Sequence, residues 1–356
     1  MTTTTVDPSA IEAFVHRFAA DLAAVAHAAT VVIGDKLGLY RALAELGPST
    51  PADLATATRC DERYLREWLC AQAASDYVNY DAATGRFHLD EAQAACLADE
   101  SSPTFLAGGM AVVSSMHKDE PAIADAFRSA GGVAWGAHHH DLFTGTERFF
   151  RPGYVANLTT AWIPALEGVE AKLAAGARVA DIGCGHGVST ILMAETYPAS
   201  TFVGVDNHAA SIETARARAK EAGVDGRVRF EVAAAALPGD GYDLVCIFDA
   251  LHDMGDPTAA ARRIRQSLAP DGTFLLVEPN AGDRLEDNLN LVGRIFYSAS
   301  TLVCTPASRA EGGPAAACLG AQAGEARLAE VCRNAGFTRF RRATETPFNI
   351  VLEARP

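Results

Sequence analysis

The sequence has no excess of positive charge. Of its 356 residues, 30 are Lys or Arg and 44 are Asp or Glu, which gives a formal net charge of −14. Binding to nucleic acid or to an anionic membrane depends on Lys and Arg side chains that neutralise phosphates. The composition therefore disfavours both of these partners.

Long apolar runs and paired cysteines are also missing. We find no apolar run that approaches the length of a bilayer span, and the Thr-rich residues 1–8 place no basic region ahead of an apolar one. The eight cysteines are scattered and none forms a CxxC pair, so we expect reduced thiols in a cytoplasmic protein. Hydrophobic residues make up 49% of the chain, which is enough for a sizeable core, and the length suffices for two domains.

The first helical stretch, residues 10–29, has more apolar surface than one thin domain covers. Its apolar side chains recur at a spacing of three to four residues: Phe14, Phe18, Leu22 and Val25. An exposed apolar face of this kind is typical of contacts between copies of a chain. We therefore expect a homodimer built through the amino-terminal domain.

The following residues predict a winged helix. The expected elements are helices at 31–46, 50–56 and 61–71 and hairpin strands at 77–80 and 86–89. Winged helices often bind DNA, but the second helix of the pair mixes Arg63 and Arg66 with Glu62 and Glu67. Balanced charge of this kind binds phosphates poorly, so we expect a dimerisation module.

A glycine turn organises the second half of the chain. In residues 177–188, ARVADIGCGHGV, a short buried strand ends at Asp181 and Ile182, and glycines follow at every second position before a helix. Strand, glycine turn and helix form the first unit of a nucleotide-binding α/β fold. The third glycine comes one residue earlier than in the dinucleotide fingerprint. Asp181, two residues before the first glycine, favours a cationic ligand over a pyrophosphate.

The strand at 201–205 ends in Asp206, at the spacing expected of a ribose-hydroxyl acceptor. D-x-G-x-G-x-G followed by such a strand resembles motif I of class I S-adenosylmethionine (SAM)-dependent methyltransferases. The resemblance implies SAM as the cofactor. The cofactor-binding residues that we expect are Asp181, Gly183, Cys184, Gly185, Gly187, Asp206, Asn207 and Asp249. An NAD(P)-dependent oxidoreductase is disfavoured by the early third glycine and by the lack of a Tyr-x-x-x-Lys set.

From residue 178 onward strands alternate with helices, which predicts a mostly parallel sheet with right-handed crossovers. The last two strands, 338–344 and 348–353, are almost directly connected and must be antiparallel. We therefore expect an α/β fold with a Rossmann-like, seven-stranded, mostly parallel sheet, as in class I methyltransferases, after an amino-terminal, mainly helical winged-helix domain. The expected domains are a winged-helix domain at 1–95, a helical linker at 96–170 and a SAM-binding domain at 171–356.

A second chemical stretch, FDALHDMGDP, follows a strand at the sheet edge where ligands bind. LHDMGD resembles the LHDW-type segment of small-molecule O-methyltransferases, whose histidine is the general base and whose amino-terminal winged-helix domain dimerises. The resemblance implies that His252 is the base, and a neutral imidazole suits removal of a hydroxyl proton near pH 7. Asp253 or Glu278 can orient the ring, and spacing does not choose between them. A packing role for His252 is the alternative.

Two segments are candidates for the acceptor pocket: residues 135–154 and the irregular stretch 280–324, which is too long for a mere connection. We expect a mostly apolar pocket with a few polar groups. The candidate substrate-binding residues are His139, Phe149, Phe150, Tyr154, Phe296 and Tyr297. The three histidines at 138–140 do not predict a metal site, because adjacent residues on a regular element cannot all face one point.

A wider resemblance covers nearly the whole chain. GTERFFRPGY, VADIGCGHGVSTILMA and FDALHDMGDP are similar to segments of bacterial winged-helix-plus-Rossmann SAM methyltransferases. This implies a methyltransferase for a small molecule, with oxygen as the favoured acceptor atom and nitrogen, carbon and sulfur as alternatives. The position that often holds adenine reads Ala233 to Ala236, so we expect backbone and apolar contacts there.

Two further alternatives are a SAM-binding winged-helix transcriptional regulator and a metal-dependent mechanism. The metal would be held by Asp249, Glu278 and Asn280. We favour a mechanism without a metal.

Overall fold

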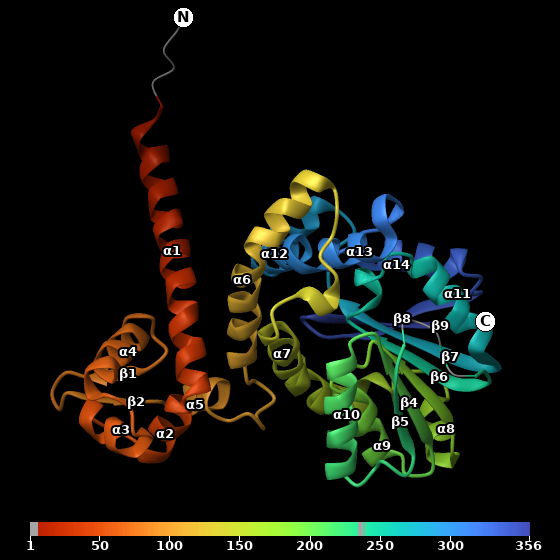
Figure 1. Ribbon diagram of the computed structural model, residues 1–356, viewed down its shortest axis with the longest axis horizontal. Coiled ribbons are helices and arrows are strands. Elements are labelled where there is room, and N and C mark those ends of the chain that lie inside the picture. Colours follow the sequence, from red (N-terminus) through yellow and green to blue (C-terminus); the bar gives the residue numbers. More distant parts are fainter. Residues whose placement is uncertain (1–5, 234–236, 238) are drawn as a thin grey trace, which may run out of the picture. The chain divides into compact units, whose positions relative to one another are not determined.

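The computed structural model describes residues 6–233, 237 and 239–356. The chain forms two compact units, each drawn in Figure 1. The predicted domain boundaries at residues 95 and 170 stay predictions.

The amino-terminal unit comprises Met1–Ser114 together with Thr144–Pro152. The carboxyl-terminal unit comprises Ser115–Phe143 and Gly153–Pro356. The middle of helix α7 (Asp141–Asn157) therefore groups with the first unit, whereas its two ends group with the second.

The amino-terminal unit is mainly helical, with one hairpin. Its elements are α1 (Pro8–Lys36), α2 (Leu39–Leu46), α3 (Pro51–Thr58), α4 (Glu62–Ala74), β1 (Asn79–Asp81), β2 (Arg86–His88), α5 (Glu91–Leu97) and the start of α6 (Ala107–Ser129). Asp61 caps α4, because its carboxylate accepts hydrogen bonds from the backbone N–H groups of Arg63 and Tyr64. The strands β1 and β2 are antiparallel. The predicted helical winged-helix domain is confirmed.

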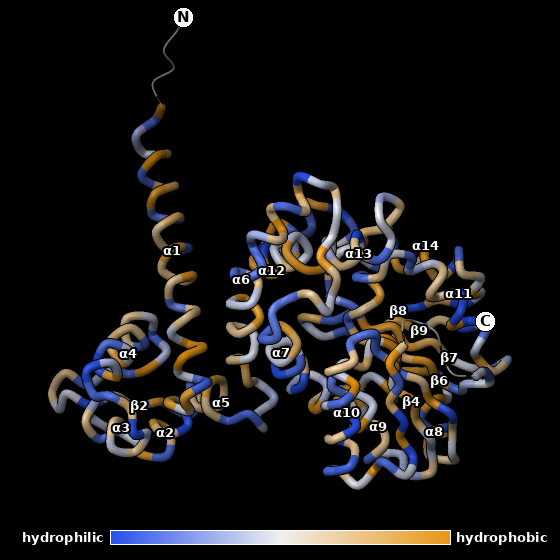
Figure 2. Tube along the Cα trace, viewed as in Figure 1, coloured by the Kyte–Doolittle hydropathy of each residue, from blue (hydrophilic) through white to orange (hydrophobic). Residues whose placement is uncertain are grey.

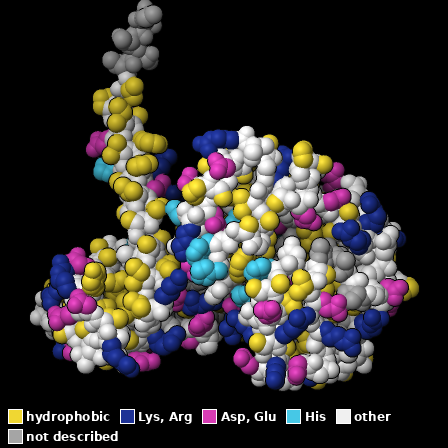
Figure 3. All heavy atoms as spheres, in the orientation of Figure 1, with side chains coloured by type: hydrophobic (Ala, Val, Ile, Leu, Met, Phe, Trp, Pro, Cys, Tyr) yellow, Lys and Arg dark blue, Asp and Glu magenta, His cyan; other side chains and the backbone are white. Residues whose placement is uncertain are grey.

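The apolar side chains of helix α1 are exposed to solvent. Phe14, Phe18 and Leu22 are 64%, 61% and 60% exposed, and Figure 3 shows hydrophobic side chains along the whole helix. By length and composition, α1 is long and apolar enough to cross a membrane. The expectation that nothing approaches a bilayer span is thus wrong. Single charged residues interrupt the apolar run, but the many alanines keep its mean hydropathy high.

The carboxyl-terminal unit is built on a seven-stranded sheet in the order β5-β4-β3-β6-β7-β9-β8. The strands are β3 (Arg178–Ile182), β4 (Thr201–Asp206), β5 (Val228–Val232), β6 (Tyr242–Phe248), β7 (Leu268–Pro279), β8 (Arg339–Glu345) and β9 (Asn349–Arg355). All neighbours are parallel except β9, which is antiparallel to both β7 and β8. The predicted class I methyltransferase fold, including its antiparallel strand, is confirmed.

Helices cover the sheet on both faces (Figure 1). They are α8 (Val169–Ala175), α9 (Val188–Thr196), α10 (Ala209–Glu221), α11 (Pro257–Ser267) and α14 (Gly324–Asn334). The segment between β7 and α14 adds α12 (Leu291–Ala299) and α13 (Thr305–Gly312). Short helical turns are η1 (Trp135–Ala137), η2 (Leu158–Trp162), η3 (Leu251–Asp253), η4 (Leu285–Asn288), η5 (Ser300–Cys304) and η6 (Gly313–Ala315).

Residues 280–324 correct one prediction, because much of the segment expected to be irregular is helical. Asn290 caps α12 by accepting from the backbone of Gly293, and the chain continues through η5 into α13. The apolar residues of this segment already have helical spacing.

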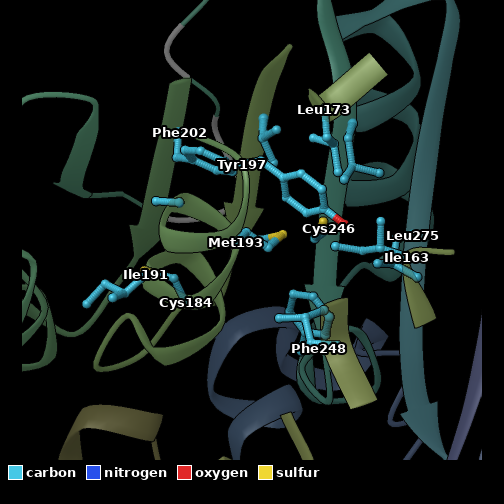
Figure 4. Close-up of a cluster of buried hydrophobic side chains, with 14 of the residues drawn as sticks. Ile163, Leu173, Cys184, Ile191, Met193, Tyr197, Phe202, Cys246, Phe248 and Leu275 are labelled. Carbon is cyan, nitrogen blue, oxygen red and sulfur yellow. The ribbon is translucent and has the colours of Figure 1, made fainter. Parts of the chain in front are cut away.

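Alternating side chains of the strands enter two cores. On β6, Cys246 and Phe248 face the helices α8 and α9, whereas Val245 and Ile247 face α11 and α14. Figure 4 shows Met193 of α9 among the labelled side chains of the first core, and Figure 2 shows the hydrophobic strands between more hydrophilic outer segments. Close packing on both faces fixes the strands, and therefore the positions of the residues at their carboxyl ends.

Candidate active site

The glycine turn after β3 needs glycine for two reasons. Gly183 and Gly187 have φ values of +73° and +79°, where side chains other than glycine are strained. An added Cβ would lie 2.9 Å from the Cβ of Ala250 at Gly183, and 2.7 Å from the Phe230 ring at Gly187. The turn is therefore packed tightly against the loop that follows β6 and against β5.

Asp206 joins the glycine turn to the end of β4. Its two carboxylate oxygens accept hydrogen bonds from the backbone N–H of Gly185 at 2.9 Å and of His208 at 2.8 Å. Asn207 is exposed beside it. Cys184 is buried and its thiol lies next to Gly204 of β4. Only the backbone of Cys184 is therefore available to a ligand at the turn.

Asp181 is buried beneath the turn, with an exposed fraction of 1%. One oxygen, Oδ2, accepts from the hydroxyls of Ser189 and Thr190, each at 2.6 Å. The other, Oδ1, is buried and has no hydrogen-bond partner in the described part of the chain. Burial raises the pKa of Asp181 to about 6, although the two hydroxyls lower it. A buried carboxylate oxygen without a partner fits a ligand that brings a positive charge.

Glu278 orients His252 from the neighbouring strand. Its Oε1 accepts from the backbone N–H of Leu251 at 2.9 Å, and its Oε2 is hydrogen-bonded to Nδ1 of His252. Both side chains are buried, and Asp253 lies on the other side of the ring, with Oδ1 3.3 Å from Nε2. Burial lowers the pKa of His252, but the Glu278 and Asp253 carboxylates outweigh it and hold the pKa well above its usual value.

Cys304 is a neighbour of His252 that sequence reasoning missed. The π-helical turn η5 brings its thiol near the imidazole and Asp253, so that the three ligand atoms lie within 4.8 Å of one another. Burial, with the Asp253 carboxylate, raises the pKa of Cys304 to about 11. Periodicity gave no indication of this contact, because it depends on the fold of residues 280–304. These three residues form one of two described groups whose donor atoms could hold a metal ion.

Asp249 follows β6 in a left-handed backbone conformation, with φ 49°. Its Oδ1 accepts from the side-chain amide of Asn349 on β9 at 2.8 Å, and its Oδ2 from the hydroxyl of Tyr154 at 3.4 Å. Burial and the nearby Glu278 raise the pKa of Asp249 to about 8. Asn280, named with Asp249 and Glu278 as a possible metal ligand, donates its amide to the carbonyl of Thr346.

The three adjacent histidines separate into two kinds. His138 is buried, with Nδ1 2.9 Å from Asp119, and its Nε2 has no partner among the described residues. The rings of His139 and His140 lie 4.2 Å apart and, with Asp141, form the second group that could hold a metal ion. His139 and His140 lie side by side because they precede α7 and are not part of a regular helix, whereas His138 is separate.

The other predicted substrate-binding residues lie in different places. Phe149 and Phe150 belong to the amino-terminal unit, where their rings are 5.2 Å apart and Phe149 packs beside Gly109. Phe296 and Tyr297 are half-buried on α12, which leads into η5. Tyr154 is brought to Asp249. The predicted adenine position, Ala233 to Ala236, lies outside the described residues except for Ala233.

Comparison with known proteins identifies two domains in the chain. Residues 173–336 match the family described as "Methyltransferase domain". The chain carries a methyltransferase domain. Residues 24–99 match the Rv2258c-like winged HTH domain, so the predicted combination of a winged-helix domain and a methyltransferase domain is confirmed.

One curated relative of the methyltransferase domain is the 27-O-demethylrifamycin SV methyltransferase of Amycolatopsis mediterranei. It is 33% identical over 166 residues, which are 44% of this chain and 59% of the relative. The chain thus matches little more than half the length of that protein.

Among solved structures, the mitomycin 7-O-methyltransferase aligns with a TM-score of 0.69 at 21% identity, over 98% of this chain and 100% of the other. Human N-acetylserotonin methyltransferase, in complex with SAM, aligns with a TM-score of 0.67 at 19% identity, over 100% and 99%. At these identities the similarity shows a shared fold.

Proposed function

We propose that this protein transfers a methyl group from SAM to a hydroxyl oxygen of a small molecule, with His252 as the general base. The observation that carries the proposal is the buried His252–Glu278 pair, placed within a methyltransferase domain directly after β6, the strand beside the glycine turn. The names of the 27-O-demethylrifamycin SV and mitomycin 7-O-methyltransferases support oxygen as the acceptor atom.

The residues at the ends of β3 and β4 fit SAM. We assign Asp206 to the ribose hydroxyls, the turn Gly183–Gly187 to close backbone contact, and the free oxygen of Asp181 to the cofactor's ammonium group. Cys184 and Asn207 belong to the same turn and strand end. When bound, SAM supplies a methyl group that its sulfonium has already activated.

The remaining task of the protein is to align an oxygen with that methyl group and to remove its proton. Glu278 fixes the ring of His252 by holding Nδ1, so that Nε2 is the atom that accepts the proton. The contact between Glu278 and the backbone of Leu251 locks the turn that carries the ring. Asp253, near Nε2, stabilises the imidazolium that results.

The raised pKa of His252 sets a pH dependence. A base works only when it is unprotonated, so turnover of a neutral hydroxyl should rise with pH through the pKa of His252, which lies well above 6.5. An acceptor that is already ionised does not require this step and should show a flatter profile.

The same proposal includes a cytoplasmic homodimer that does not bind nucleic acid or membrane. The exposed apolar face of α1 supports self-association. On α4, Arg63 and Arg66 form ion pairs with Glu67 and Glu62 of the same helix, which leaves little net positive charge for a phosphate backbone. A gel-shift experiment at low salt separates this proposal from a SAM-binding regulator.

The test of the function is SAH formation from SAM with a panel of phenols and alcohols, combined with calorimetry of SAH binding. We expect His252→Ala to bind SAH like the native protein and to lose turnover. His140→Ala is the matched control, since the side chain of His140 is 79% exposed. A native protein that binds neither SAM nor SAH would overturn the proposal.

A further inference from the structure

Three acidic side chains lie at the ends of neighbouring strands. Asp181 is on β3, Asp249 follows β6 and Glu278 is on β7, and these strands are adjacent in the sheet. Asp181 and Glu278 are each 1% exposed. The hydroxyl of Tyr154 donates to Asp249 at 3.4 Å, and burial together with the charges of Asp249, Asp181 and Glu278 raises the pKa of Tyr154 well above its usual value.

These carboxylates are not balanced by protein cations. Glu278 is paired with His252, but Asp249 has neutral partners, Asn349 and Tyr154. The partners of Asp181 are two hydroxyls. Among the residues that the structure describes, no Lys or Arg forms an ion pair with Asp181 or Asp249. Buried carboxylates without cationic partners are costly unless they are protonated or a ligand supplies positive charge.

The proposed cofactor supplies two positive charges, the ammonium group of its amino-acid part and the sulfonium. SAH, the product, keeps the ammonium and loses the sulfonium charge. Asp181 and Asp249, which have no cationic partner in the described protein, can therefore each pair with one positive charge of SAM. SAH offers a positive charge to only one of them.

The fold indicates which acidic group faces which charge. Asp181 lies beneath the glycine turn and is tied to Ser189 and Thr190 of α9. Asp249 precedes the proposed base His252 by three residues, and the adjoining Ala250 packs against Gly183. Asp249 is therefore on the side of the site where the methyl group must meet the acceptor.

We propose that Asp249 is the residue by which the site distinguishes the sulfonium-bearing cofactor from its uncharged thioether product. This rests on the proposed function. Asn349 and Tyr154 position the carboxylate. Loss of the sulfonium charge on methyl transfer leaves Asp249 without a cationic partner, which weakens the hold on SAH and favours its release.

The substitution Asp249→Asn suits a test, because Asn has nearly the same shape and tolerates the left-handed backbone that residue 249 adopts. The probes are SAH and sinefungin, a cofactor analogue whose protonated amine replaces the methylsulfonium group. Calorimetry at pH 8.5 should show that Asp249→Asn loses about tenfold in sinefungin affinity and less than twofold in SAH affinity. The control Asp206→Asn should weaken both ligands by the same factor, since both carry the ribose.

Equal losses for the two ligands in Asp249→Asn would overturn the inference. Should that variant fail to fold, the native protein still tests it. The ratio of sinefungin to SAH affinity should rise between pH 7 and 9, as Asp249 ionises among Glu278, His252, Tyr154 and Asp181. A constant ratio would also count against it. Failure of the native protein to bind either probe would overturn the proposed function instead.

Discussion

The two halves of the sheet edge are built by different means. At the ends of β3 and β4, Asp206 is bonded to the backbone of Gly185 and His208, 21 and 2 residues away along the chain. At the ends of β6 and β7, the partners are side chains: Glu278 is paired with His252, 26 residues away, and Asp249 with Asn349, 100 residues away. Backbone N–H groups of two loops hold the first half together, whereas pairs of side chains hold the second.

The two halves also differ in the groups that hold their carboxylates. Asp206 accepts hydrogen bonds from backbone N–H groups, which stabilise its carboxylate and hold it in a fixed position. Asp249 and Glu278 are held by side chains in a buried setting, where removal of one partner leaves the other unsatisfied. Substitutions in the β6–β7 half should therefore affect chemistry, stability and the affinity for a positively charged cofactor, whereas substitution of Asp206 should affect the affinity for any cofactor that carries the ribose.

The largest effect should come from Glu278→Gln. It keeps the shape of the side chain but removes the negative charge that raises the pKa of His252. We expect turnover to fall on the order of 10²-fold, within the range for a disabled general base, and its pH profile to move to lower pH. Rate measurements across pH 6–10 check this. An unchanged rate and profile would show that Glu278 only supports the loop.

Asp206→Ala should act on the other half. It removes the proposed ribose acceptor and should weaken SAH binding by about 1.5–3 kcal/mol, the range for a hydrogen bond to a charged group. The turn should also loosen, because the N–H groups of Gly185 and His208 lose their acceptor. Calorimetry of SAH binding measures the effect, and an unchanged affinity would contradict the assignment of Asp206 to the cofactor site.

A smaller effect is expected on stability as the pH changes. The folded-state pKa of Asp249 is about 8 and that of Asp181 about 6, both above the unfolded value of 3.8, so the folded state binds more protons. Their stabilising contribution is complete below pH 3.8 and is lost as the pH rises toward 6 for Asp181 and 8 for Asp249. Each kcal/mol lost should lower the Tm by roughly 2–4 °C in a domain of this size.

Thermal unfolding without ligand, followed from pH 5 to pH 9, checks this prediction, with Asp249→Asn as the control that should flatten the curve. A Tm that rises over this interval in the native protein, and falls in the variant, would contradict the pKa assignments.

The smallest effect on the site should come from α1, which belongs to the amino-terminal unit. Phe18→Asp places a charge on the exposed apolar face and should shift the proposed dimer toward monomer, as measured by light scattering. SAH affinity should stay unchanged. A native protein that is monomeric at micromolar concentration would remove the proposed interface.

The sequence predicted the fold well because its evidence is local. Strand and helix alternation, the D-x-G-x-G-x-G turn and the short connection between the last strands predict a mostly parallel sheet whose last two strands are antiparallel, as observed. His252 and Glu278 could be named because one follows β6 and the other lies at the end of β7, at the same edge of the sheet.

The contacts that were missed depend on segments far along the chain. Cys304 reaches His252 through a π-helical turn, and Asn349 reaches Asp249 from the antiparallel strand β9. His138, the buried histidine paired with Asp119, could not be told apart from His139 because the bend before α7 has no regular period. Side-chain partners of this kind follow from packing and not from spacing.

The central claim is that His252 takes the acceptor's proton, and the most direct measurement compares two acceptors in His252→Ala. One is a neutral hydroxyl and the other a related phenol that is already ionised at the assay pH. The variant should lose on the order of 10²–10⁴ in turnover of the neutral acceptor and much less with the ionised one, while its SAH affinity stays native. Equal losses for both acceptors, or full turnover of the neutral one, would contradict the claim.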